Sequence, residues 1–96
     1  MTTEQMLSAA KTYDTLVQWI PAQIVYEMEQ YNIAQETGTV SEVESRYSRI
    51  EALCMVLDRM HYTTTWDFRK ERFSALYVSA PYGEKRTRYP VATFTP

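Results

Sequence analysis

The chain contains only two glycines, Gly38 and Gly83, among its 96 residues. Glycine adopts positive φ angles without steric cost, and the tight turns of all-β folds depend on it. A chain this poor in glycine therefore favours long helices with few connections. Its length is near the lower end of the range in which a single domain can bury a core of its own.

The first third of the chain has apolar residues at helical spacing. The residues that share this face are Met6, Ala9, Ala10, Tyr13, Leu16, Val17 and Ile20. Pro21 removes a backbone donor and disfavours helical geometry at the residue before it, but it suits the first turn of a new helix. We therefore expect one helix over 4–19 and a second over 21–36.

A third helix is predicted over 41–61. Thr39–Glu42 and Ser41–Glu44 are overlapping capping boxes, in which a hydroxyl and a carboxylate satisfy free N–H groups at a helix start. Within this helix the segment 52–57 is apolar almost all round. The predicted second helix likewise has Tyr26 and Ile33 nearly opposite its main apolar face.

Three helices of a chain this short would not cover both of these additional apolar surfaces, which points to contact between copies of the chain. We therefore expect a homo-oligomer, a dimer or a larger assembly. The residues expected to mediate self-association are Tyr26, Ile33, Ala52, Met55 and Val56.

After residue 61 the periodicity weakens, and two interpretations remain. A fourth helix over 65–78 would place Trp66, Phe73 and Tyr77 on one face. Alternatively, the strand "SALYVS" turns at Pro81–Gly83 into "TRYPVATF". The predicted fold is thus mainly α, with three to four helices in a bundle over residues 1–80. An extended basic and aromatic C-terminal arm, or a short β-hairpin, follows over 81–96.

Catalytic and metal-binding sites are not expected. One histidine and one cysteine cannot supply a zinc site without carboxylates at ligand spacing. Cys54 and His61 share a helical face but lie about 10 Å apart along it, beyond the roughly 3 Å reach of a hydrogen bond. Asp58 and His61 are close enough for a structural pair, and no glycine-rich phosphate loop is present. We expect a protein that is not an enzyme and has no cofactor.

Charge is distributed unevenly along the chain, whose formal net charge is −2. Residues 1–66 carry nine acidic and four basic residues, whereas 67–96 carry three acidic and six basic ones. Aromatic residues are interleaved with these cations, as in surfaces that bind proteins or single-stranded nucleic acid. The candidate partner-binding residues are Arg69, Lys70, Arg72, Tyr82, Lys85, Arg86, Arg88, Tyr89 and Phe94.

The favoured function is therefore binding of another protein, as an adaptor or inhibitor. Binding of single-stranded nucleic acid or an anionic ligand is the alternative, and a structural subunit of an assembly is a third. Small size without catalytic residues is also typical of accessory proteins of viruses and mobile elements. The start "MTTEQMLSAA" lacks the pattern of a secretory signal, and "ALCMVL" is far shorter than a membrane span, so we expect a cytoplasmic protein with no membrane contact.

Overall fold

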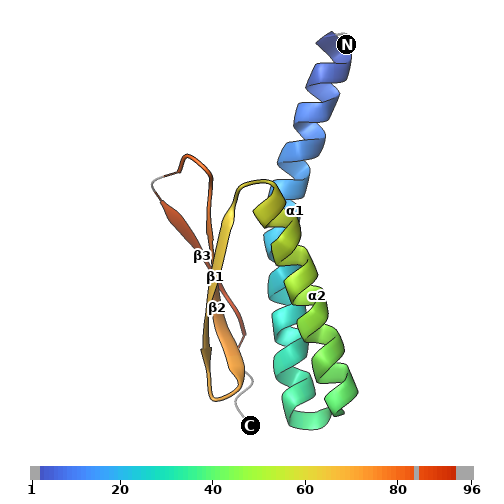
Figure 1. Cartoon of the computed structure of the whole chain (residues 1–96), viewed down its shortest axis with the longest axis vertical. Coiled ribbons are helices and arrows are strands. Elements are labelled where there is room, and N and C mark those ends of the chain that lie inside the picture. Colours follow the sequence, from blue (N-terminus) through green and yellow to red (C-terminus); the bar gives the residue numbers. More distant parts are fainter. Residues whose placement is uncertain (1–2, 84, 93–96) are drawn as a thin grey trace.

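The computed structural model describes residues 3–83 and 85–92, with the side chains of 17–83 and 85–92. Two helices precede three strands, namely α1 (Thr3–Thr37), α2 (Val40–Arg59), β1 (Thr63–Arg69), β2 (Arg72–Ser79) and β3 (Arg86–Pro90). The strands form one antiparallel sheet in the order β1-β2-β3, and this sheet lies against the helical hairpin as a second layer (Figure 1). The prediction of a mainly α bundle is therefore wrong, and the fold is α+β.

α1 continues unbroken through Pro21, so the predicted division into two helices at this residue is wrong. Proline costs about 3 kcal/mol in a helix interior, because it removes a hydrogen bond and crowds the preceding turn. Pro21 is buried here, and Ile20 and Ile24 beside it are almost completely buried. Full burial of one such isoleucine contributes about 1.5–3 kcal/mol, so packing offsets the cost of the proline.

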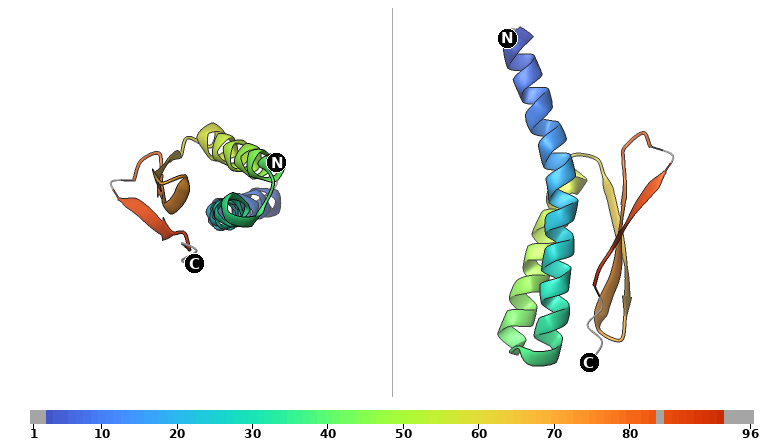
Figure 2. Two further views of the ribbon diagram at one scale, coloured as in Figure 1. Left: turned by 90° about the horizontal axis from the view of Figure 1, so that it is seen from below. Right: turned by 180° about the vertical axis from the view of Figure 1, so that it is seen from behind.

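The two helices differ greatly in length. At 1.5 Å per residue the 35 residues of α1 extend about 52 Å, close to the 53 Å longest dimension of the molecule. α2 has only 20 residues and runs back beside the C-terminal part of α1. The N-terminal turns of α1 consequently project beyond both α2 and the sheet (Figure 2).

α2 corresponds closely to the predicted third helix, and local sequence defines both of its ends. The Thr39 hydroxyl accepts a hydrogen bond from the N–H of Glu42 at its start. At its end His61 has a positive φ of 67°, and the N–H of Tyr62 donates to the carbonyl oxygen of Leu57 at 2.9 Å. This is a Schellman motif with histidine at the position that usually holds glycine.

The predicted fourth helix over 65–78 is wrong, because this segment forms β1 and β2. Thr64 lies opposite Val78, and Trp66 lies opposite Leu76 in the β1–β2 ladder. β2 then pairs with β3, as in the hairpin alternative. The three consecutive threonines favour a strand over a helix here, since β-branched residues pack well on a pleated surface and lose rotamer freedom in a helix.

The β1–β2 connection shows why the scarcity of glycine was misleading. Arg69 lies opposite Arg72, so Lys70 and Glu71 alone form the turn. Their φ angles are 52° and 63°, the left-handed values of a type I′ turn, which Asn-Gly usually supplies. A tight hairpin is thus built without glycine.

The core lies between the sheet and the helices. Its central members are Ile24, Met28, Ile50, Leu57, Phe73, Leu76 and Val78. A buried carboxylate also joins the helices, since Glu27 of α1 accepts from Arg46 of α2 at 2.9 Å and lies 3.7 Å from Arg49. α1 packs under β2 and β3, whereas α2 packs under β1.

Candidate functional site

The sheet stops at β1, which leaves one flank of α2 uncovered beside this edge strand. Two adjoining hollows lie along this flank. One, of about 510 Å³, is lined by Tyr31, Val43, Glu44, Tyr47 and Ser48. The other, of about 380 Å³, is lined by Glu51, Cys54, Met55, Asp58, Thr64 and Trp66. Together they form the α2–β1 groove.

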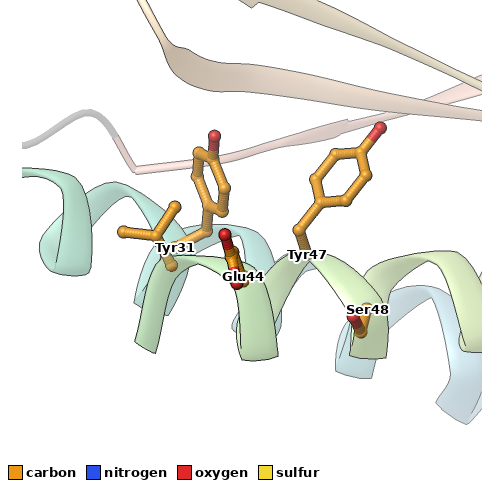
Figure 3. Close-up of a pocket in the computed structure, with 5 residues that line it drawn as sticks. Tyr31, Glu44, Tyr47 and Ser48 are labelled. Carbon is orange, nitrogen blue, oxygen red and sulfur yellow. The ribbon is translucent and has the colours of Figure 1, made fainter. Parts of the chain in front are cut away.

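Aromatic rings form one end of the α2–β1 groove. Tyr31 and Tyr47 project from the helices toward the strands (Figure 3), with ring centroids 6.2 Å apart. Tyr31 also meets Phe68 and Phe73 edge-on at 6.1 and 5.0 Å. Tyr47 and Phe68 remain 38% and 43% exposed, so two rings are available to a ligand while their neighbour Phe73 is buried.

Trp66 connects the aromatic end of the groove to the core. Its ring meets that of Phe73 edge-on, with centroids 5.9 Å apart. Edge-to-face pairs of this kind contribute about 0.5–1.5 kcal/mol beyond the area they bury. Trp66, Phe73, Phe68 and Tyr31 thus form one connected aromatic cluster beside this end of the groove.

Acidic residues line the helical side of the groove. Glu44, Glu51 and Asp58 are seven residues apart on α2, which is two helical turns, so all three lie on the same flank. All are exposed, and within the part of the chain that the structure describes no cation lies within salt-bridge distance of them. The groove therefore combines aromatic rings with unpaired negative charge.

Cys54 reaches the groove but is buried. Burial raises the pKa of its thiol, and a hydrogen bond with Thr64 acts in the opposite direction. A thiol with a raised pKa is a poor nucleophile. No salt bridge joins Asp58 to His61, and the described residues contain no cluster of His, Cys, Asp and Glu able to hold a metal ion.

The structure places the predicted partner-binding cations at opposite ends of β2. Arg69 and Lys70 lie at the β1–β2 turn, and Arg72 next to them forms an ion pair with Glu36 of α1. Lys85 and Arg88 are exposed in or beside β3 at the other end. These residues do not form one continuous basic surface.

The predicted partner-binding aromatics are also in different environments. Tyr82 is fully exposed in the β2–β3 connection, whereas Tyr89 packs against the core. Arg86 stacks its guanidinium 4.1 Å from the centroid of the Tyr77 ring, whose hydroxyl donates to Asp67 at 2.8 Å. Phe94 lies outside the described residues.

The residues predicted for self-association fall on two surfaces. Tyr26 and Ile33 lie on α1 about half a turn away from the buried Ile24, and Ala52 and Val56 lie on the adjoining side of α2. Met55 instead lines the α2–β1 groove. We call the first surface the hairpin face.

The hairpin face also includes a residue that the sequence did not single out. Trp19 is 54% exposed and precedes Tyr26 by seven residues, so the two share a stripe along α1. A hollow of about 390 Å³ beside it is lined by Trp19, Gln23, Glu27, Arg49, Ala52 and Leu53. The face thus presents large apolar side chains from both helices.

The α2–β1 groove itself was missed because its members come from segments that were interpreted separately. Glu44 was interpreted only as part of a helix start, and Phe68 as part of a helix rather than a strand. Two patterns could have indicated the groove: acidic residues at seven-residue spacing and the alternation of Thr64, Trp66 and Phe68.

No known protein family, no curated protein and no solved structure matches this chain. Among the described residues, no helix is both long enough and apolar enough to span a membrane.

Proposed function

We propose that the protein is a non-enzymatic binding protein, an adaptor or inhibitor, whose α2–β1 groove receives a segment of another protein. The observation that carries this proposal is the pair of rings, Tyr47 and Phe68, left about 40% exposed beside a concave surface. Aromatic side chains in such positions are typical of the residues that dominate binding energy at protein interfaces.

The positions of the cations favour a protein over a nucleic acid as the partner. Arg72 is engaged with Glu36, and Arg86 already covers the ring of Tyr77, so neither the charge nor the ring is free for a nucleotide. A groove lined by Glu44, Glu51 and Asp58 would repel a phosphate backbone. The nucleic-acid alternative is therefore the weaker one.

Self-association is the second part of the proposal, and we assign it to the hairpin face rather than to the groove. Trp19, Tyr26 and Ile33 follow one another at seven-residue spacing, which is the repeat of a helix that packs along another helix. A second copy placed there would cover these side chains and leave the α2–β1 groove open for the partner.

The proposal is tested by photo-crosslinking in the source cell. A photoreactive residue replaces Ser48, which is exposed at the groove, and in a matched control it replaces Thr65, which is exposed on the outer face of the sheet. We expect a defined protein adduct from position 48, absent from position 65 and lost when Tyr47→Ala is added. Equal adducts from both positions, or adducts only to nucleic acid, would overturn the proposal.

A further inference from the structure

β1 is an edge strand with one side unpaired. It pairs with β2 from Thr63 to Arg69, with one register shift between Asp67 and Phe68, and no other described strand lies beside it. In an antiparallel ladder every second residue directs its N–H and C=O away from its partner strand. The free edge of β1 therefore presents a row of backbone donors and acceptors along Thr63–Arg69.

An additional strand on this edge would lie over the uncovered flank of α2. Strands in a sheet are about 4.8 Å apart, so a fourth strand would extend the sheet from β1 across the two hollows of the α2–β1 groove. Half of its side chains would point toward α2, on the same side of the sheet as Trp66 and Phe68. The exposed rings of Phe68 and Tyr47 would flank them.

The charges on α2 define the chemistry of this strand. Glu44 and Asp58 are 14 residues apart, about 21 Å along the helix, and Glu51 lies midway. At about 3.3 Å per residue, six or seven strand residues cover the same distance. Lysine or arginine at alternate positions would then reach all three acids, and their aliphatic stems would pack on the rings.

We propose that the α2–β1 groove takes an extended cationic segment of a partner protein, which pairs with β1 as a fourth strand. This inference rests on the proposed function and names the partner class for the same groove. It requires both backbone pairing to β1 and charge pairing with Glu44, Glu51 and Asp58. A nucleic acid meets neither requirement.

A second copy of the chain is a poorer fit to the groove. The cations Arg86 and Arg88 belong to β3, which is already paired with β2. The free edge of β3 could join β1 of another copy, but Arg86 stacks on Tyr77 on the face of the sheet that points away from the helices, so in a continuous sheet with the helices on one side these cations would not face α2. The occupant is therefore expected to come from a different protein.

The probe is a labelled synthetic peptide of about nine residues in which lysine alternates with valine and threonine, long enough to span β1. Its binding to the full chain is measured by fluorescence anisotropy. We expect saturable binding that weakens about two- to five-fold for each of Glu44→Gln, Glu51→Gln and Asp58→Asn, since exposed ion pairs contribute about 0.2–1 kcal/mol each. The triple variant should lose about ten-fold or more.

The matched control is Glu42→Gln, which removes the same charge from α2 two residues from Glu44 but on the opposite flank. This variant should bind the peptide as the parent does. Circular dichroism establishes that each variant remains folded. If Glu42→Gln and Glu44→Gln weaken peptide binding equally, the effect depends only on the net charge of the protein, and the proposal is overturned.

Backbone pairing is tested with two N-methylated forms of the same peptide. Methylation of alternate residues removes the donors from one edge of a strand and leaves the other edge intact. We expect one form to lose binding and the other to retain it, and the β1 amide signals in NMR spectra to shift on binding. If both forms bind equally, the peptide does not add to β1 and the proposal fails.

Two further outcomes separate this proposal from the proposed function. A protein adduct at position 48, together with no binding of the cationic peptide, would retain the proposed function and overturn the fourth-strand inference. Tight binding of a peptide spanning the chain's own residues 81–92 would make a second copy the occupant and would likewise overturn it. If position 48 gives no protein adduct and the cationic peptide does not bind, both proposals are overturned.

Discussion

The side-chain amide of Asn32 hydrogen-bonds both backbone groups of Phe73. Its Nδ2 donates to the carbonyl oxygen and its Oδ1 accepts from the N–H, each at 2.9 Å. The pairing of β3 with β2 ends at Pro90, opposite Ala75, so β3 does not reach Phe73. The amide takes the place of a peptide group of a neighbouring strand, and it ties α1 to the central strand of the sheet.

Replacement of Asn32 should therefore lower the free energy of unfolding by more than the loss of one small polar side chain usually does. Asn32→Leu keeps the volume similar but leaves the N–H and C=O of Phe73 buried without partners, which costs about 1–3 kcal/mol per group. We expect a loss of about 2–4 kcal/mol in the free energy of unfolding, measured by urea denaturation. Gln18→Leu, at an exposed position of α1, is the control and should change stability by less than about 0.5 kcal/mol. A similarly small effect of Asn32→Leu would show that the hydrogen bonds between Asn32 and Phe73 do not stabilise the fold.

Residues that favour the backbone conformation of the β1–β2 turn should stabilise the protein. Lys70 and Glu71 are both left-handed, and this conformation costs a residue with a Cβ roughly 1–2 kcal/mol. The double variant Lys70→Asn, Glu71→Gly should raise the free energy of unfolding by about 1–2 kcal/mol, since Asn-Gly is the preferred type I′ sequence. Thermal unfolding measures the change. A lower melting temperature would mean that the two side chains make contacts worth more than the strain.

These two features also show which parts of the fold the sequence could predict. The start of α2 was predictable because its cap depends on neighbouring residues, Thr39 and Glu42. The continuation of α1 through Pro21 was not predictable, since the local penalty of proline is outweighed by burial against distant residues. The β1–β2 hairpin was missed because Lys70 and Glu71 carry no turn signature. The prediction of a mainly α fold rested on the scarcity of glycine and on apolar residues at helical spacing.

The candidate site was less predictable than the fold. Its two walls come from α2 and β1, and only the packing of the sheet on the helices brings Glu51 close to Trp66. The cations that were predicted to bind a partner form two groups, one of which includes Arg72, already paired with α1. Cations that are close in sequence are separated in space, because one group lies at the β1–β2 turn and the other pairs with the opposite half of β2, where Arg88 is opposite Tyr77.

Cys54 should react slowly with thiol reagents while the protein is folded. Burial raises the pKa of its thiol, so the thiolate is scarce at neutral pH. Because the folded pKa lies above the unfolded one, the neutral thiol's contribution to stability is complete below the unfolded pKa. It is lost as the pH rises through the folded pKa, in the alkaline range.

The measurement is the rate of labelling of Cys54 by a disulfide reagent at neutral pH, with and without denaturant. We expect the rate in the folded protein to be many times lower and to rise steeply at alkaline pH. The Cys54→Ala variant provides the blank and should show a weaker alkaline loss of stability than the parent. Labelling at the unfolded rate in native buffer would show that the thiol is accessible and contradict the structure.

Self-association should depend on the hairpin face and not on the groove. Trp19→Ser and Tyr26→Ser each remove a large exposed apolar side chain, so we expect only a small change in the stability of the single chain. In sedimentation velocity at tens of micromolar we expect the parent to sediment as a dimer or larger species and the double variant as a monomer. Met55→Ser removes a comparably exposed side chain on the groove side and should leave the assembly intact. A monomeric parent would refute self-association, whereas dissociation by Met55→Ser alone would place the contact between copies in the α2–β1 groove and exclude a fourth strand there.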